Sequence, residues 1–131
     1  MLVVDSSVWI AYFNGERSPE TDYLHAALGR QPILVGDLML VEVLQGYREE
    51  EDFEKALQAL GRFHQVSLLS PALAIRCARN YRSLRRAGIT VRKTYCIEHG
   101  HVLLHYDRDF DAFETHLGLH VVHPASPAML D

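Results

Sequence analysis

Cysteine is scarce in this sequence, which has only Cys77 and Cys96 among its 131 residues. The two are too far apart to make the short-spaced pair of a zinc ribbon or a redox motif. We therefore expect no disulfide and no cysteine metal site. The simplest interpretation is that both are thiols packed as small apolar side chains.

Long apolar runs are also lacking. No stretch approaches the roughly 20 apolar residues that span a bilayer, and Asp5 interrupts the first apolar run after four residues. These features predict a cytoplasmic protein that does not contact a membrane. The length is that of one ordinary domain, and we expect a single domain over residues 1–131.

An excess of basic charge is missing as well. The net charge is −4, which argues against a simple basic coat for nucleic acid. The charges are unevenly distributed, however. Nine Lys and Arg residues and no acid lie between Lys55 and Ile97, and all 17 acids lie in the flanks. This pattern can place phosphate-binding charge beside an acidic cluster.

Apolar runs and helical spacing alternate along the chain. Short apolar runs predict strands at 2–4, 33–35, 66–69, 101–105 and 119–122. Caps and helical periodicity predict helices from about residue 8, from residue 18, from residue 37, over 49–63, and from residue 70 to about 87. Alternating strands and helices predict an α/β fold with a central, mainly parallel sheet between two layers of helices.

Three acids follow or adjoin the predicted strands. Asp5 ends the first strand, Asp107 follows the strand 101–105, and Glu42 lies one turn into the helix after the second strand. Ligands of parallel sheets bind at the carboxyl ends of the strands, so these side chains should meet at one edge. Gathered carboxylates repel one another unless a cation lies between them, and carboxylate oxygens favour Mg²⁺ or Mn²⁺.

The alternative for these acids is a structural role. An Asp after a strand is commonly a helix cap, and this applies to Asp5 and Asp107 taken singly. Glu42 differs, because it lies in the apolar run 38–44 and needs a partner there. Ser6 or Ser7 could orient a metal-bound water.

Three segments, in order and at fitting spacing, resemble the motifs of PIN-domain ribonuclease toxins of the VapC family. They are Asp5-Ser6-Ser7-Val8-Trp9-Ile10, Leu40-Val41-Glu42-Val43-Leu44-Gln45-Gly46 and Leu103-Leu104-His105-Tyr106-Asp107-Arg108-Asp109-Phe110. The resemblance implies a three-layer PIN-like fold and magnesium-dependent RNA cleavage. It also implies a homodimer that is inhibited by a cognate VapB-type antitoxin.

The resemblance assigns Asp5, Glu42 and Asp107 as catalytic residues. These three and Asp109 are the candidate metal ligands. Successive members of the alternating run at 107, 109 and 111 cannot share a face of a helical turn, so we do not expect all three to bind metal. Ser6 and Ser7 are further candidates for the substrate site.

The sequence departs from the family pattern after Thr94. The family continues with Ile-Asp and an apolar helix, whose Asp is the third site acid, whereas here Thr94 runs directly into Tyr95-Cys96-Ile97-Glu98. About two helical turns are absent. Either the protein lacks them or the printed sequence omits them. We favour omission, because a deletion through a core helix should damage the fold.

Arginines are regularly spaced between residues 76 and 86. Arg79, Arg82 and Arg86 lie on roughly one face of the predicted helix together with Arg76. Each could simply be a solvated side chain. As a group without nearby acids, they predict contact with an RNA backbone.

Two other function classes remain open at this point. A PIN fold without a metal ligand could bind RNA or antitoxin without cleaving. A phosphatase of the haloacid dehalogenase type also begins with an Asp after strand one, but it requires a second Asp where this sequence has Ser7. A receiver-like signalling domain fits poorly, since its paired acids and late Lys are missing.

Overall fold

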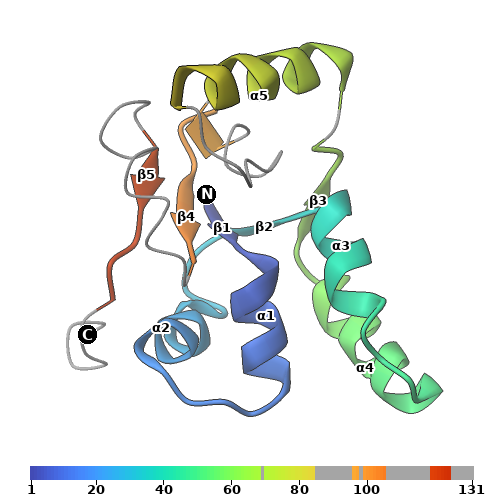
Figure 1. Cartoon of the computed structure of the whole chain (residues 1–131). Coiled ribbons are helices and arrows are strands. Elements are labelled where there is room, and N and C mark those ends of the chain that lie inside the picture. The colour runs from blue at the N-terminus through green and yellow to red at the C-terminus, as the bar shows by residue number, and fades with distance from the viewer. Residues whose placement is uncertain (69, 85–95, 98, 106–118, 125–131) are drawn as a thin grey trace.

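The computed structural model of the chain describes residues 1–68, 70–84, 96–97, 99–105 and 119–124, shown in Figure 1. Its centre is one sheet of five parallel strands in the order β3-β2-β1-β4-β5. The strands are β1 (Leu2–Val4), β2 (Ile33–Gly36), β3 (His64–Val66), β4 (Val102–Leu104) and β5 (His120–Val121).

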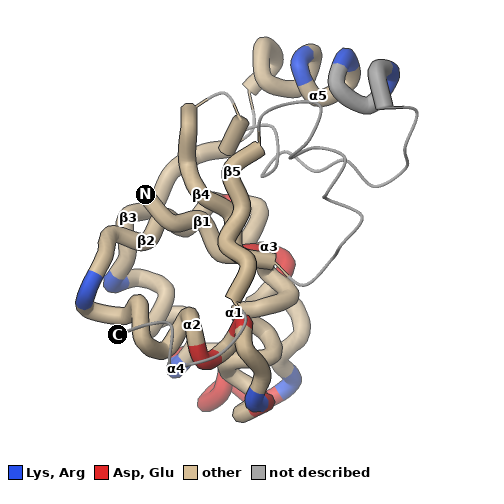
Figure 2. Tube along the Cα trace, turned by 90° about the vertical axis from the view of Figure 1, so that its left-hand side faces the viewer, with Lys and Arg blue, Asp and Glu red and all other residues tan. Residues whose placement is uncertain are grey.

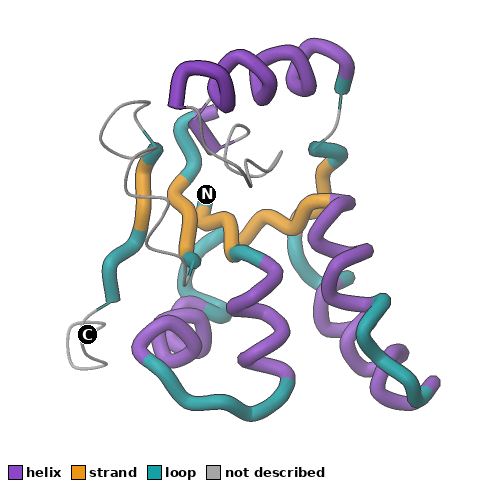
Figure 3. The backbone as a smooth tube through the Cα atoms, in the orientation of Figure 1, coloured by secondary structure: helices purple, strands orange, loops and turns teal. Residues whose placement is uncertain are grey.

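Helices connect the first four strands. They are α1 (Ser6–Phe13), α2 (Pro19–Ala27), α3 (Asp37–Leu44), α4 (Glu50–Leu60) and α5 (Pro71–Leu84). In Figures 1 and 3, α5 lies above the strands, and α1 to α4 lie below them. The strand order explains this, because right-handed crossovers place the helices of β1-β2-β3 on one face and those of the return to β4 on the other. The predicted three-layer α/β architecture with a parallel sheet is confirmed.

The core is built from the apolar strands and the inner sides of the helices. All residues of β1 and β2 are buried, as a parallel sheet covered on both faces requires. Trp9 of α1 is 1% exposed; its ring stacks on Phe13 and is tilted against Phe63, with ring centroids 5.6 and 5.4 Å away. Cys96 is fully buried and forms no disulfide, as expected, whereas Cys77 is only partly buried.

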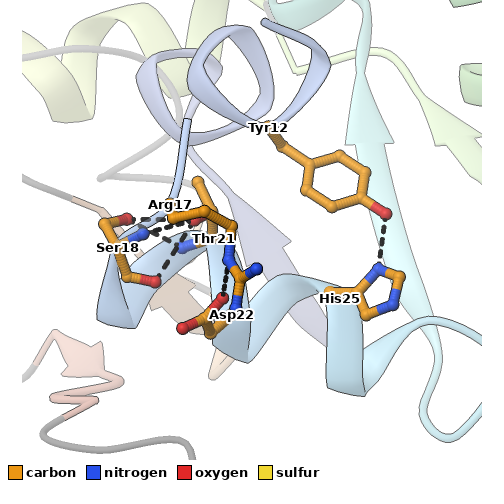
Figure 4. Close-up of polar contacts among 6 residues, drawn as sticks. All are labelled: Tyr12, Arg17, Ser18, Thr21, Asp22 and His25. Carbon is orange, nitrogen blue, oxygen red and sulfur yellow. Dashed lines mark hydrogen bonds and ion pairs between the residues drawn. The ribbon is translucent and has the colours of Figure 1, made fainter. Parts of the chain in front are cut away.

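The α1–α2 corner is fixed by polar contacts, drawn in Figure 4. Ser18 caps α2 in a capping box with Thr21, and Pro19 occupies the first turn. The Tyr12 hydroxyl lies 2.8 Å from His25 Nδ1, which links the two helices directly. This corner agrees with the predicted start of the second helix at residue 18.

Two local predictions were wrong. The third strand lies at His64–Val66 rather than 66–69. The first helix begins at Ser6 and not near Val8, so Asp5 is its cap in place of the serines.

No helix among the described residues is both long and apolar enough to cross a membrane.

Candidate functional site

Asp5 lies at the carboxyl end of the central strand β1. It is 7% exposed, and its backbone N–H donates to the Leu104 carbonyl (2.8 Å), which fixes the ends of β1 and β4 to each other. Its carboxylate accepts hydrogen bonds from the Ser7 N–H (3.2 Å) and the Ser7 hydroxyl (2.5 Å). Asp5 is therefore held in one orientation as the cap of α1. Capping does not exclude a second role for the same carboxylate.

Glu42 reaches this end of the sheet from α3. It is partly buried, and its Oε2 accepts a hydrogen bond from the Ser6 hydroxyl at 2.9 Å. As a charged residue in an apolar run, Glu42 required a polar partner. That partner is Ser6, the residue next to Asp5. Carboxylates from two elements, separated by 37 positions in sequence, flank the first turn of α1.

The two serines hold carboxylates in this structure. Ser6 contacts Glu42 and Ser7 contacts Asp5, so each hydroxyl supports one acid. The predicted contact of Ser6 and Ser7 with the substrate stays a prediction.

The remaining predicted site acids, Asp107 and Asp109, lie outside the described residues. Within the described ranges, no group of three or more His, Cys, Asp or Glu residues is placed to hold a metal ion. Asp5 and Glu42 supply carboxylate oxygens, with the Ser6 and Ser7 hydroxyl oxygens next to them. Such donors suit Mg²⁺ or Mn²⁺ rather than zinc.

His105 was missed by the sequence analysis as a member of this region. It follows β4 directly, is 8% exposed, and comes one residue after the carbonyl that binds Asp5. It lies in the motif before Asp107, but no sequence pattern indicated that its ring is buried. A buried imidazole therefore follows β4 at the same end of the sheet as Asp5.

Asp37 was also missed. It follows β2, and its carboxylate accepts from the backbone N–H of Leu68 (3.0 Å), the Ser67 hydroxyl (3.1 Å) and the Leu38 N–H (2.9 Å). The Leu68 N–H is the main reason that the pKa of Asp37 is lowered; partial burial opposes this, and the Ser67 and Leu38 bonds add to it. These contacts fasten the end of β3 to the start of α3, which is a structural role.

The basic helix lies apart from the acids. Arg76, Arg79 and Arg82 are all exposed on α5, whereas Leu73 is buried. Arg86 lies outside the described residues. In Figure 2 the basic segments of α5 are at the top, and acidic segments gather around the lower helices. Basic segments also occur among the lower helices in that view, so basic charge is not confined to α5.

Comparison with known proteins agrees with this architecture. The family model of the PIN domain matches residues 2–115. The chain is 26% identical over 121 residues to a VapC ribonuclease of Mycobacterium bovis, Mb1587, covering 85% of this chain and 90% of that protein. The same figures hold for ribonuclease VapC11 of Mycobacterium tuberculosis. With its parallel sheet and its acids at the ends of β1 and in α3, this chain belongs to the PIN domain family, in which its relatives include VapC ribonucleases.

Proposed function

We propose that the protein is a metal-dependent ribonuclease, the toxin of a type II toxin–antitoxin pair. The observation that carries the proposal is the arrangement of Asp5 and Glu42, which are both fixed by serines of the same helical turn. The relatives named as ribonucleases support the RNA substrate. By the same similarity we propose a VapB-type antitoxin as partner, a homodimer as the assembly and the cytoplasm as the location.

Asp5, Glu42 and Asp107 would hold the metal ion, with Asp109 as a further ligand. Mg²⁺ or Mn²⁺ bound there would lower the pKa of a water molecule and neutralise charge on the scissile phosphate. The chain's own contribution is orientation. The Ser7 hydroxyl fixes the Asp5 carboxylate, and the Ser6 hydroxyl fixes that of Glu42. Carboxylates held in this way lose little conformational entropy when an ion binds.

The test of this function is a charge-removing substitution at Glu42. The protein expressed without an antitoxin should arrest growth, and Glu42→Gln should relieve the arrest. Purified Glu42→Gln should cleave RNA roughly a hundredfold more slowly or worse, since even outer-sphere partners of a metal site contribute about 10–100-fold. Its fold should persist, because the amide keeps the shape of the side chain.

Glu54→Gln is the matched control, because Glu54 is exposed on α4 and lies outside the three site segments. Its cleavage rate should equal that of the wild type. Metal binding is followed separately: Mg²⁺ should raise the melting temperature of the wild type, and Asp5→Asn should abolish the rise. A metal-induced shift that survives Asp5→Asn, or cleavage that persists in EDTA, would refute the proposed site.

One sequence observation favours a second candidate function. The direct join of Thr94 to Tyr95 leaves no Asp between Asp52 and Asp107, where the family places a site acid. A PIN fold lacking that acid would bind RNA or antitoxin without efficient cleavage. RNA binding by the wild type without metal-dependent cleavage would select this function.

A further inference from the structure

A pocket of about 480 Å³ lies at the end of the sheet opposite the carboxylates. It is lined by Gly29, Arg30, Gln31, Pro32, Ile33, Arg62, Phe63 and His64. Ile33 and His64 are the first residues of β2 and β3, whereas the candidate metal site is at the strands' carboxyl ends. The four residues of β2 separate the two regions by about 10–13 Å along the strand. The pocket is thus distinct from the proposed catalytic site.

Two equivalent connections build the walls of this pocket. One runs from the end of α2 into β2, and the other from the end of α4 into β3. The first is tied down by the N–H groups of Arg30 and Gln31, which both donate to the Ala27 carbonyl (3.0 and 3.2 Å). Gly29 has φ +77°, a conformation that favours glycine at this turn. The second is held by the Phe63 N–H, which donates to the Leu60 carbonyl (3.2 Å).

The charge of the lining is positive. Arg30 and Arg62 contribute two guanidinium groups, His64 and Gln31 add further polar side chains, and the lining contains no Asp or Glu. Among the described residues, no carboxylate lies within ion-pairing distance of Arg30 or Arg62. In a protein of net charge −4, two such arginines facing one hollow are suited to an anion, and guanidinium groups match the geometry of phosphate.

An aromatic wall accompanies this charge. Phe63 is partly exposed in the pocket, and its ring centroid lies 5.4 Å from that of buried Trp9. Arginines for a phosphate and an aromatic face for a base are the two elements of nucleotide recognition on single strands. We propose that this pocket binds a phosphate-bearing nucleotide, either a free mononucleotide or one unit of a single-stranded RNA.

The competing role for the two arginines is local stabilisation. Arg30 and Arg62 follow closely on the ends of α2 and α4, where a positive side chain offsets the partial negative charge of the helix terminus. Stability and binding therefore have to be measured on the same variants.

The chain contains its own reporter for this experiment. Trp9 is the one tryptophan in the sequence and contacts Phe63 from the side of the core. We would titrate AMP, and separately a short single-stranded RNA, into the full chain in EDTA, following Trp9 fluorescence and checking Kd by calorimetry. EDTA removes divalent ions and so suppresses binding at the carboxylates.

Saturable binding of either probe is expected, and the Arg30→Gln and Arg62→Gln variants should each raise Kd by about tenfold, as expected for loss of a charge-assisted hydrogen bond. The matched control is Arg79→Gln/Arg82→Gln on α5, which should leave the AMP Kd unchanged. Binding of AMP identifies a free nucleotide as sufficient, whereas RNA binding that the pocket substitutions weaken, with no binding of AMP, identifies a strand. If neither probe binds, or if the pocket substitutions leave the Kd of both probes unchanged in variants that remain folded, the proposal is wrong.

Discussion

At the residue scale, the instructive side chain is Asp37, which joins three neighbours with one carboxylate. Its partners, Leu38, Ser67 and Leu68, include two residues some 30 positions away. Hydrogen bonds to the ionised form keep the pKa of Asp37 below its ordinary value of 3.8. A lowered folded-state pKa stabilises the protein above the unfolded-state pKa, and this contribution is lost as the pH falls through the folded-state value.

Asp37→Ala should therefore lower the free energy of unfolding at neutral pH by about 1–2 kcal/mol, the usual effect of losing hydrogen bonds to a charged group. The difference between variant and wild type should shrink as the pH falls below 3.8, where the wild-type carboxylate becomes protonated. Urea unfolding between neutral pH and about pH 3 measures this. Asp37→Asn is the control: it keeps an acceptor but cannot ionise, so its own pH dependence should be flatter. Parallel acid destabilisation of wild type and Asp37→Asn would contradict the assignment.

Residue-scale patterns explain which site predictions could be made from the sequence. Asp5 and Glu42 were identified because an acid after a strand and an acid in an apolar run are unusual. The serine contacts were not foreseen, because they depend on the side-chain geometry of the first turn of α1. The predicted roles of Asp107, Asp109 and Arg86 stay predictions, since those residues lie outside the described ranges.

At the scale of elements, most strands and helices followed from the alternation of apolar runs and caps. The buried face of α3 could not be predicted in this way. Nearly every position from Leu38 to Leu44 is apolar, so helical periodicity does not single out one face. The third strand was displaced for a different reason. Ser67 and Leu68 bind Asp37 instead of continuing the ladder, and no local sequence pattern reports that long-range contact.

The junction of β2 and α3 offers a test of packing between elements. A Cβ added to Gly36 would overlap Cδ1 and Cγ of Leu68, which is only 1% exposed. Gly36→Ala should destabilise the protein by about 1–3 kcal/mol, as overpacking in a core does. Gly46→Ala is the control, because its Cβ would meet only the Val43 carbonyl at 3.8 Å. Equal melting temperatures for the two variants would show that Leu68 moves aside without cost.

The arginines of α5 are predicted to contact the RNA backbone. Replacing Arg79, Arg82 and Arg86 together by Gln should weaken RNA binding and flatten its salt dependence, by roughly 0.7 in the logarithmic slope for each lost contact to a single strand. Binding measured over a series of salt concentrations gives this slope. Arg48→Gln, at an exposed position between α3 and α4, should leave it unchanged. An unaltered slope in the triple variant would identify the three arginines as solvated surface.

At the scale of the whole molecule, the sheet is continuous on both sides of the departure after Thr94. Strand β4 pairs with β1 over its full length, and Cys96 is fully buried in the core. A deletion there was expected to damage the fold, and whether the segment is deleted or omitted stays open. In this structure the described strands on both sides of the departure belong to one parallel sheet.

The missing acid gives a prediction for the chain as a whole. The 131-residue protein should cleave RNA far more weakly than a version with Ile-Asp and about two turns of apolar helix inserted after Thr94. The physical reason is that a third carboxylate would tighten the metal ion. The same insertion carrying Asn in place of Asp is the control and should not raise the rate. Strong metal-dependent cleavage by the uninterrupted 131-residue chain would show that the segment is dispensable.

The brevity of the two outer strands has a consequence for solubility. Strand β5 pairs with β4 through two residues, and β3 presents three residues of which His64 and Gln65 are exposed and polar. Each rim of the sheet therefore offers only a few free backbone donors and acceptors to a neighbouring chain. Once folded, the described strands, with most of their apolar residues enclosed in β1, β2 and β4, present little template for edge-to-edge aggregation.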